Sequence, residues 1–302
     1  LFPKELVRWQ DSLPMTLREG RILMEKLFEN GTLTLKEAGV QKLAEEKEAN
    51  SGKPVIKLKN LYFRYAKNAD DVLRGLNLEI EEGKLHCLLG GNGSGKSTTL
   101  KAICEIIKPQ SGKVKIADNC RAAMVPQNPQ ALFTEISCEE EVLEGLCYQK
   151  LEIEEKVQRT EEMLKLMEIE HLRKANPYDL SGGEQQRLAL AKVMVSNPDI
   201  LLLDEPTKGL DPFFKQTLGR ILRSLCKENK TIFMVSHDIE FCAEFGDRCS
   251  MFFDGEIATS GSAKEFFSGN NFYTTVENKL TRKWCEGIIT GEEARTWIRS
   301  LL

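Results

Sequence analysis

The stretch GGNGSGKSTT occupies residues 90–99, between the apolar run KLHCLLG at 84–90 and the helical pattern STTLKAICEII at 97–107. Glycines ahead of a lysine pack poorly in a hydrophobic core, but they let the backbone N–H groups of a tight loop turn inward. The start of the following helix adds the positive end of its dipole. The stretch therefore predicts an anion-binding loop between a buried strand and a helix.

The spacing of this loop narrows the expected anion to a nucleotide phosphate. Gly90, four residues, Gly95, Lys96 and Ser97 match the P-loop pattern in its required context, after a strand and before a helix. Lys96 is expected to neutralise the β- and γ-phosphates, and the Ser97 hydroxyl to ligate Mg²⁺. A glycine-rich turn with an exposed lysine is the alternative. The other loop residues predicted to bind the nucleotide are Asn92, Gly93, Ser94 and Thr98.

Two further stretches carry groups that suit phosphate chemistry. ILLLDEP at 200–206 places Asp204 and Glu205 at the end of an apolar strand, where Asp204 could support Mg²⁺ and Glu205 accept a proton from water. Alternatively, both acids mark the point where the strand reaches solvent. LSGGEQQRLALAKV at 180–193 places Ser181, Gly182 and Gly183 before a helix, which predicts a second anion-ready helix start.

Composition bounds the class of protein. The chain has 302 residues, 41% of them hydrophobic, which suffices for one large domain or two ordinary ones. Its 42 Lys+Arg against 46 Asp+Glu give a net charge of -4, which offers no general attraction for nucleic acid. The nine cysteines form no CxxC pair, so we expect reduced thiols rather than disulfides or structural zinc. No apolar run reaches the length of a membrane span.

The pattern along the chain predicts three parts. Residues 1–52 are expected to be a helical segment or linker, in which Thr34 and Glu37 form a capping box. Residues 53–270 are expected to form a nucleotide-binding domain, and residues 271–302 a helical extension. Apolar strands alternating with helices indicate an α/β fold with a mostly parallel sheet and a helical insert over about 128–180. Further capping boxes are predicted at Ser137/Glu140, Ser262/Glu265 and Thr290/Glu293.

Taken in order, GGNGSGKST, LSGGEQQRLALAKV, DEPTKGLD and SHD resemble the motif set of the ABC ATPases over residues 55 to about 260. The resemblance implies a P-loop NTPase core with a mostly parallel sheet, an antiparallel β subdomain and a helical insertion. It also implies that two nucleotide-binding domains pack head to tail. The signature of each then covers the ATP on the other's P-loop. The signature residues here are Ser181, Gly182, Gly183 and Glu184, the last standing where many members have glutamine.

The same resemblance implies roles for single residues. Tyr65 matches the aromatic that stacks on adenine, although a strand tyrosine is as often ordinary core. Gln127 matches the glutamine that senses Mg²⁺ and water, and His237 the switch histidine that contacts the γ-phosphate, so both join Glu205 as catalytic residues. Asp211 matches the D-loop aspartate, while an N-cap role explains it equally well.

PQNPQALF, NPYDLSGGEQQR and EPTKGLDP look most like the second half of tandem ATPases of energy-coupling-factor importers, and residues 1–50 are similar to the tail of a preceding domain. A C-terminal half of a longer protein would explain the absent initiator Met. This resemblance implies an ATP- and Mg²⁺-dependent motor for uptake of a vitamin, cobalt or nickel, lying at the cytoplasmic face of the membrane.

Its expected partners are a second nucleotide-binding domain, identical or paralogous, and transmembrane coupling and substrate-binding proteins, with no nucleic acid. The tail tryptophans Trp284 and Trp297 are expected to pack on their own domain or to hold two halves together. Alternatives are the ATPase of an exporter or a binding-protein-dependent importer, and a non-transport ABC ATPase acting on DNA or the ribosome.

Overall fold

The computed structural model describes residues 14, 16–33, 52–270 and 273–301, which fall into two compact units. The sheet unit comprises Ser51–Asp238 and Asp247–Ser260, and the helical unit comprises Leu1–Asn50, Ile239–Gly246 and Gly261–Leu302. The predicted capping box of Thr34 and Glu37, and the helix after it, lie outside the described residues.

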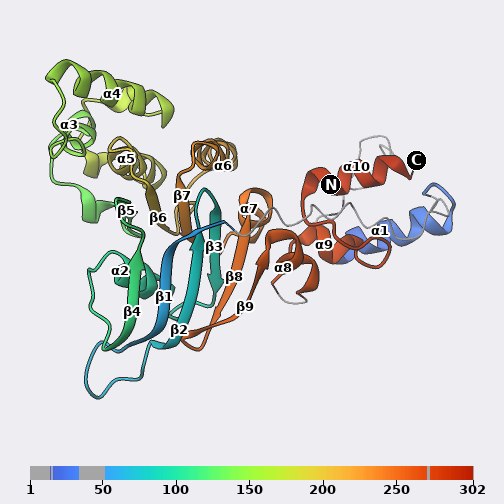
Figure 1. Ribbon diagram of the computed structural model, residues 1–302. Coiled ribbons are helices and arrows are strands. Elements are labelled where there is room, and N and C mark those ends of the chain that lie inside the picture. Colours follow the sequence, from blue (N-terminus) through green and yellow to red (C-terminus); the bar gives the residue numbers. More distant parts are fainter. Residues whose placement is uncertain (1–13, 15, 34–51, 271–272, 302) are drawn as a thin grey trace. The chain divides into compact units, whose positions relative to one another are not determined.

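A six-stranded sheet organises the sheet unit, in the order β5-β6-β7-β3-β8-β9 (Figure 1). The pairs β5–β6, β6–β7, β7–β3 and β3–β8 are parallel, so their carboxyl ends meet at one edge. Every residue of β3, β6 and β7 is buried, which explains their almost wholly apolar sequences. The bounds are β3 Leu85–Gly90, β5 Ala122–Val125, β6 Ile200–Asp204, β7 Thr231–Val235, β8 Arg248–Phe253 and β9 Glu256–Ser262.

A second, antiparallel sheet has the order β2-β1-β4, formed by β1 (Pro54–Phe63), β2 (Leu73–Glu81) and β4 (Ser111–Ile116). Figure 1 shows it as a layer of its own with α2 (Lys96–Ile103) beside it. Apolar side chains of β1 and β2 share one core with Leu100 and Ile103 of α2 and with strands of the large sheet. This core fixes the start of α2 against the end of β3.

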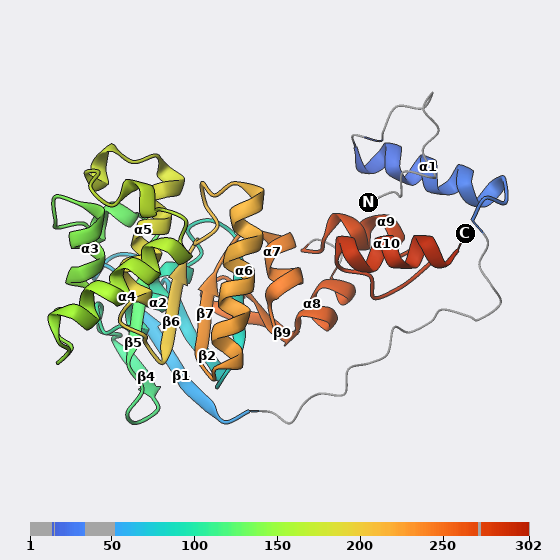
Figure 2. The same ribbon diagram turned by 90° about the horizontal axis from the view of Figure 1, so that it is seen from above.

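Helices fill the stretch between β5 and β6, which Figure 2 shows at the β5 edge of the sheet. Another long helix, α6 (Pro212–Lys227), contacts β7 and β3. The predicted fold class is confirmed: a mostly parallel α/β core, an antiparallel β sheet and a helical insertion. The helical segments before β6 are η2 Pro129–Leu132, α3 Cys138–Glu144, α4 Ile153–Leu166, η3 Glu170–Leu172, η4 Pro177–Asp179 and α5 Gly182–Met194.

The helical unit has a small core of its own, in which Met24 and Leu27 of α1 pack with Leu280 and Ile298. The ring of Phe28 stacks on Trp284 with centroids 5.2 Å apart and lies 6.4 Å from Trp297. The tail tryptophans thus pack against α1, within one compact unit that joins the two predicted end segments. The unit's helices are α1 Leu17–Glu29, α7 Ile239–Phe245, α8 Ala263–Gly269, α9 Val276–Thr281 and α10 Gly291–Ser300.

Two of the three predicted capping boxes that fall within the described residues are complete. Both reciprocal bonds of a capping box are present at the starts of α8 and α10, as predicted. At α3, Ser137 accepts the N–H of Glu140, but the Glu140 carboxylate accepts the Ser137 hydroxyl instead of the N-cap N–H. That predicted box is therefore only half formed.

Candidate nucleotide-binding site

The glycine loop connects the buried strand β3 to helix α2. Gly95 has φ +118°, and a Cβ there would lie 2.9 Å from the Val72 carbonyl oxygen, so the tight entry into the helix requires glycine. Lys96 is only 5% exposed, and its Nζ donates to the carbonyls of Gly90 at 2.9 Å and Gly91 at 2.8 Å. The alternative of a turn with an exposed lysine is wrong. Burial lowers the pKa of Lys96, opposed by the charges of Glu205 and Asp204.

Ser97 and Asp204 form the pair that suits Mg²⁺. The Ser97 hydroxyl donates to Asp204 Oδ1 at 3.0 Å, which links α2 to the end of β6. Among the described residues no cluster of three or more His, Cys, Asp or Glu could hold a metal. Mg²⁺ commonly uses one or two protein oxygens and completes its shell with phosphates and water, and this pair fits that habit.

Glu205 follows β6 in an unusual backbone conformation. Its φ of +53° lies in the left-handed region, which costs a non-glycine residue about 1–3 kcal/mol. Its N–H donates to the Val235 carbonyl at 2.9 Å, which holds the turn. Asp204 is 3% and Glu205 9% exposed, so the alternative that they mark a strand emerging into solvent is wrong. Burial raises the pKa of both carboxyls.

His237, after β7, lies against both Glu205 and Lys96. Its N–H donates to Glu205 Oε2 at 3.2 Å, and its Nε2 lies 3.1 Å from Glu205 Oε1 and 3.3 Å from Lys96 Nζ. Oε1 nevertheless has no well-directed hydrogen bond within the described part of the chain. Burial, and then the charge of Lys96, lower the pKa of His237. Residues far apart in sequence thus meet at one point.

Two residues predicted for the nucleotide site, Gln127 and Tyr65, are exposed. Gln127 is exposed and follows β5, whose Val125 pairs with Leu203 of β6, so it extends from the same sheet edge as Asp204. Tyr65 is 60% exposed, and its hydroxyl hydrogen-bonds Thr98 Oγ1 at 3.0 Å. That contact ties Tyr65 to α2.

The remaining residues of the glycine loop are partly exposed and partly buried. Asn92 and Gly93 are exposed. Ser94 Oγ is buried without a hydrogen-bond partner in the described ranges, so a group with phosphate oxygens would satisfy it.

The start of α5, the second predicted anion-ready helix start, is held by hydrogen bonds between Ser181 and Glu184. Ser181 accepts the Glu184 N–H at 3.4 Å, and Glu184 Oε2 accepts the Ser181 N–H at 2.8 Å, a complete capping box. A Cβ on Gly183 would lie 2.8 Å from the Gly209 carbonyl oxygen, which explains the glycine beside Gly182. Within the described ranges no hydrogen bond or ion pair joins these residues to the glycine loop.

Asp211 caps α6, and its Oδ1 accepts the N–H groups of Phe213 and Phe214, both at 3.0 Å. Its N-cap explanation is therefore confirmed. The D-loop role stays a prediction.

Sequence reasoning missed a buried ion pair between the helical insert and α5. Glu141 is fully buried and pairs with Lys192 of α5, and its Oε1 accepts the N–H groups of Thr134 and Glu135 at 2.5 and 2.6 Å. Lys192 also donates to the Leu132 carbonyl at 2.6 Å. The pair therefore connects residues 132–135, which follow Gln127, to α5, the helix that begins with the signature. A lysine inside the apolar run LALAKVM was the available signal, since buried lysines need partners.

The sequence profile of the ABC transporter family matches residues 73–208. A putative ABC transporter ATP-binding protein of Bacillus cereus is 38% identical over 303 residues, covering 96% of this chain and 53% of that protein. The chain therefore spans about half the length of that relative. The energy-coupling factor transporter ATP-binding protein EcfA of Methanocaldococcus jannaschii is 33% identical over 227 residues, covering 71% of this chain and 81% of that protein.

Solved structures agree with these matches. A dimeric bacterial ABC transporter cassette aligns with TM-score 0.64 and 33% identity over 69% of this chain and 98% of its own. CbiO1 of Clostridium perfringens, part of the transporter complex CbiONQ, aligns with TM-score 0.64 and 31% identity over 76% of this chain and 96% of its own. Within the described residues, no helix is both long and apolar enough to cross a bilayer. The chain belongs to the family of ABC transporter ATP-binding proteins.

Proposed function

We propose that this chain is an ATP-hydrolysing motor of an ABC importer of the energy-coupling-factor kind. The observation that carries the proposal is the convergence of Lys96, the Ser97–Asp204 pair and the Glu205–His237 pair at the carboxyl ends of β3, β6 and β7. Ligands bind at this edge of parallel α/β sheets. Ser94 Oγ, which finds no hydrogen-bond partner among the described residues, fits a polar ligand, and Glu205 Oε1 has no well-directed hydrogen bond there although it lies near His237 Nε2.

Each residue then has a defined task. The ammonium of Lys96, held by two loop carbonyls, is placed to neutralise phosphate charge, and Ser97 with Asp204 would hold Mg²⁺, with Gln127 as a further oxygen ligand. When bound, Mg²⁺ neutralises the charge that develops on the phosphates. Glu205, buried and with a raised pKa, is suited to take the proton of an attacking water. The ring of His237 lies against the Glu205 carboxylate.

The isolated signature supports the proposal of a paired assembly. Ser181–Glu184 form an anion-ready helix start that, within the described ranges, is not joined to the glycine loop, and a relative at 33% identity is a dimeric cassette. We therefore assign the signature to the ATP of a second nucleotide-binding domain, identical or paralogous. Because each ATP would contact both domains only when the pair is closed, ATP would favour closure and hydrolysis reopening.

The similarity to EcfA and CbiO1 supports a vitamin or a cobalt or nickel ion as the transported solute. Membrane partners would select the solute, and the chain would lie peripherally on the cytoplasmic face. Co-purification with a small substrate-binding membrane protein and one transmembrane coupling protein tests this against the other transporter classes. Recovery with an exporter-type transmembrane protein instead would overturn the importer proposal.

The motor proposal is tested by the solution mass of the Glu205→Gln protein with and without Mg-ATP. A monomer that becomes a dimer supports pairing with a second copy, and a monomer that binds ATP supports a paralogous partner. Lys96→Ala should weaken both ATP binding and turnover, while Lys108→Ala, at an exposed lysine beyond the same helix, should weaken neither. Failure of the unaltered protein to bind Mg-ATP would refute the proposal.

A further inference from the structure

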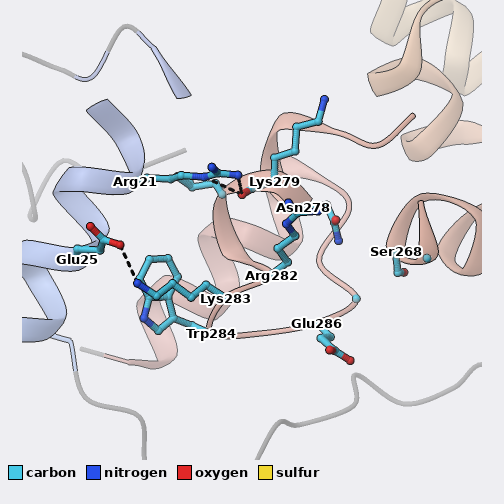
Figure 3. Close-up of a pocket in the computed structure, with 12 residues that line it drawn as sticks. Arg21, Glu25, Ser268, Asn278, Lys279, Arg282, Lys283, Trp284 and Glu286 are labelled. Atoms are coloured by element: carbon cyan, nitrogen blue, oxygen red, sulfur yellow. Dashed lines mark hydrogen bonds and ion pairs between the residues drawn. The ribbon is translucent and has the colours of Figure 1, made fainter. Parts of the chain in front are cut away.

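A cavity of about 790 Å³ lies within the helical unit, and none of the residues that line it is assigned to ATP (Figure 3). Its walls come from α1, the end of α8, α9 and the segment 282–287 that follows α9. The volume lies in the range of sites that hold small organic molecules. The sequence motifs and the proposed motor leave this cavity without a role.

The cavity is basic, although the chain as a whole is acidic with a net charge of -4. Two acidic residues, Glu25 and Glu286, also line it, and Lys283 Nζ lies 2.7 Å from Glu25 Oε1. The lining therefore retains net positive charge, which favours an anionic ligand. The basic residues of the lining are Arg21, Lys279, Arg282 and Lys283.

The guanidinium of Arg21 is held in a fixed orientation. Its Nε and one terminal nitrogen donate to the Lys279 carbonyl oxygen at 3.2 and 2.8 Å. These bonds join α1 to α9 across 258 positions of sequence without neutralising the charge. A planar, oriented guanidinium suits the oxygens of a phosphate better than a flexible lysine does.

Asn278 supplies the second indication of a ligand. It is 1% exposed and lines the cavity, yet its Oδ1 has no hydrogen-bond partner among the residues that the structure describes. A buried acceptor without a partner is destabilising. Arg282, the residue directly after α9, also lines the cavity, and Figure 3 shows it and Asn278 opposite Ser268 of α8. A ligand with both anionic oxygens and an O–H group would satisfy this wall.

We propose that this cavity binds a small phosphate-bearing anion, either inorganic phosphate or a phosphate monoester. The phosphate oxygens pair with the basic wall, and an O–H of the ligand donates to Asn278 Oδ1. The bound anion bridges α1 and α9 and thereby stabilises the helical unit. None of these residues belongs to the ATP site, so the proposal stands or falls separately from the motor function.

Tryptophan fluorescence tests this directly, because Trp284 and Trp297 both belong to the helical unit, while the third tryptophan, at position 9, lies outside the described residues. Trp284 lines the cavity itself. Inorganic phosphate and glycerol 3-phosphate are titrated separately into the full chain at constant ionic strength. The Lys96→Ala chain is titrated in parallel, to weaken phosphate binding at the glycine loop.

We expect a saturable change with a dissociation constant in the millimolar range or tighter, unaltered by Lys96→Ala. Arg282→Gln and Lys279→Gln should each weaken it at least tenfold, while Arg299→Gln, which removes the same charge from α10 outside the cavity, should change it less than twofold. If both compounds bind, the phosphate group alone is sufficient for recognition. If only glycerol 3-phosphate binds, the ligand is an organic phosphate. No change with either compound, an equal change with potassium chloride, or equal weakening by Arg299→Gln would overturn the proposal.

Discussion

The sheet unit and the helical unit differ in how far their contacts can be predicted from the sequence. In the sheet unit, short motifs bring buried charged groups, such as Lys96, Asp204 and Glu205, to one edge of a sheet that also has an extensive apolar core. In the helical unit, an apolar core joins α1 to helices more than two hundred positions later, through Met24, Phe28 and Trp284. Binding a phosphate requires certain residues at fixed spacings, so such a site can be predicted from the sequence. Apolar packing tolerates many spacings, so contacts between distant apolar residues cannot be predicted in this way.

The largest expected effect on stability comes from breaking the buried pair of the sheet unit. Lys192→Met leaves the Glu141 carboxylate buried and unpaired, which should lower the free energy of unfolding by about 3–5 kcal/mol in urea titrations. Lys165→Met, which removes an exposed ion pair with Glu170, should cost at most about 1 kcal/mol. Adding Glu141→Gln to Lys192→Met should recover part of the loss. Equal effects of the two lysine variants would show that the buried pair is unimportant.

The helical unit should respond to loss of apolar volume. Met24 is fully buried, so Met24→Ala should lower the stability of this unit by about 2–5 kcal/mol, measured as the urea transition of tryptophan fluorescence. Ile22→Ala, at a position 43% exposed on the same helix, should change it by less than about 0.5 kcal/mol. ATP affinity of the sheet unit should change less than twofold. A parallel loss of ATP binding would contradict the division into two units.

The sequence predicts part of the site, and tertiary contacts decide the rest. The glycine loop, Asp204, Glu205 and His237 follow from spacing and order, because strands of a parallel sheet deliver their carboxyl ends to one edge. The left-handed backbone of Glu205 was not predictable, since its cost is offset by tertiary contacts with Val235 and His237. The contact of Arg21 with Lys279 was equally hidden, because no local pattern records a partner so distant in sequence.

Two matched helix caps test whether the signature serves more than its own helix. Ser181→Ala and Ser262→Ala each remove a hydroxyl from a complete capping box, so each should cost about 1 kcal/mol of stability. Only Ser181→Ala should also reduce ATP turnover, by about 100-fold, because its hydroxyl would be a donor to the partner's phosphate. Steady-state hydrolysis at saturating ATP measures the difference. Similar turnover in the two variants would reduce Ser181 to a structural cap.

The smallest expected effect is on the pH dependence of turnover. Burial raises the pKa of Glu205, so the carboxylate becomes protonated, and loses its function as a base, at a higher pH than an ordinary Glu near about 4.3. Turnover should therefore fall on acidification with an apparent pKa above that value. His237, whose pKa is lowered, should add no loss near its usual range. An acid limb at the ordinary value would contradict the burial argument.

The most direct test of the account is to measure ATP binding and ATP turnover together in the Glu205→Gln protein. Removing the general base while preserving side-chain shape should reduce hydrolysis by about 10²–10⁴-fold. Affinity for Mg-ATP should stay within about threefold, because Lys96, Ser97 and Asp204 remain in place. Undiminished turnover would remove Glu205 as the base and contradict the account at its centre.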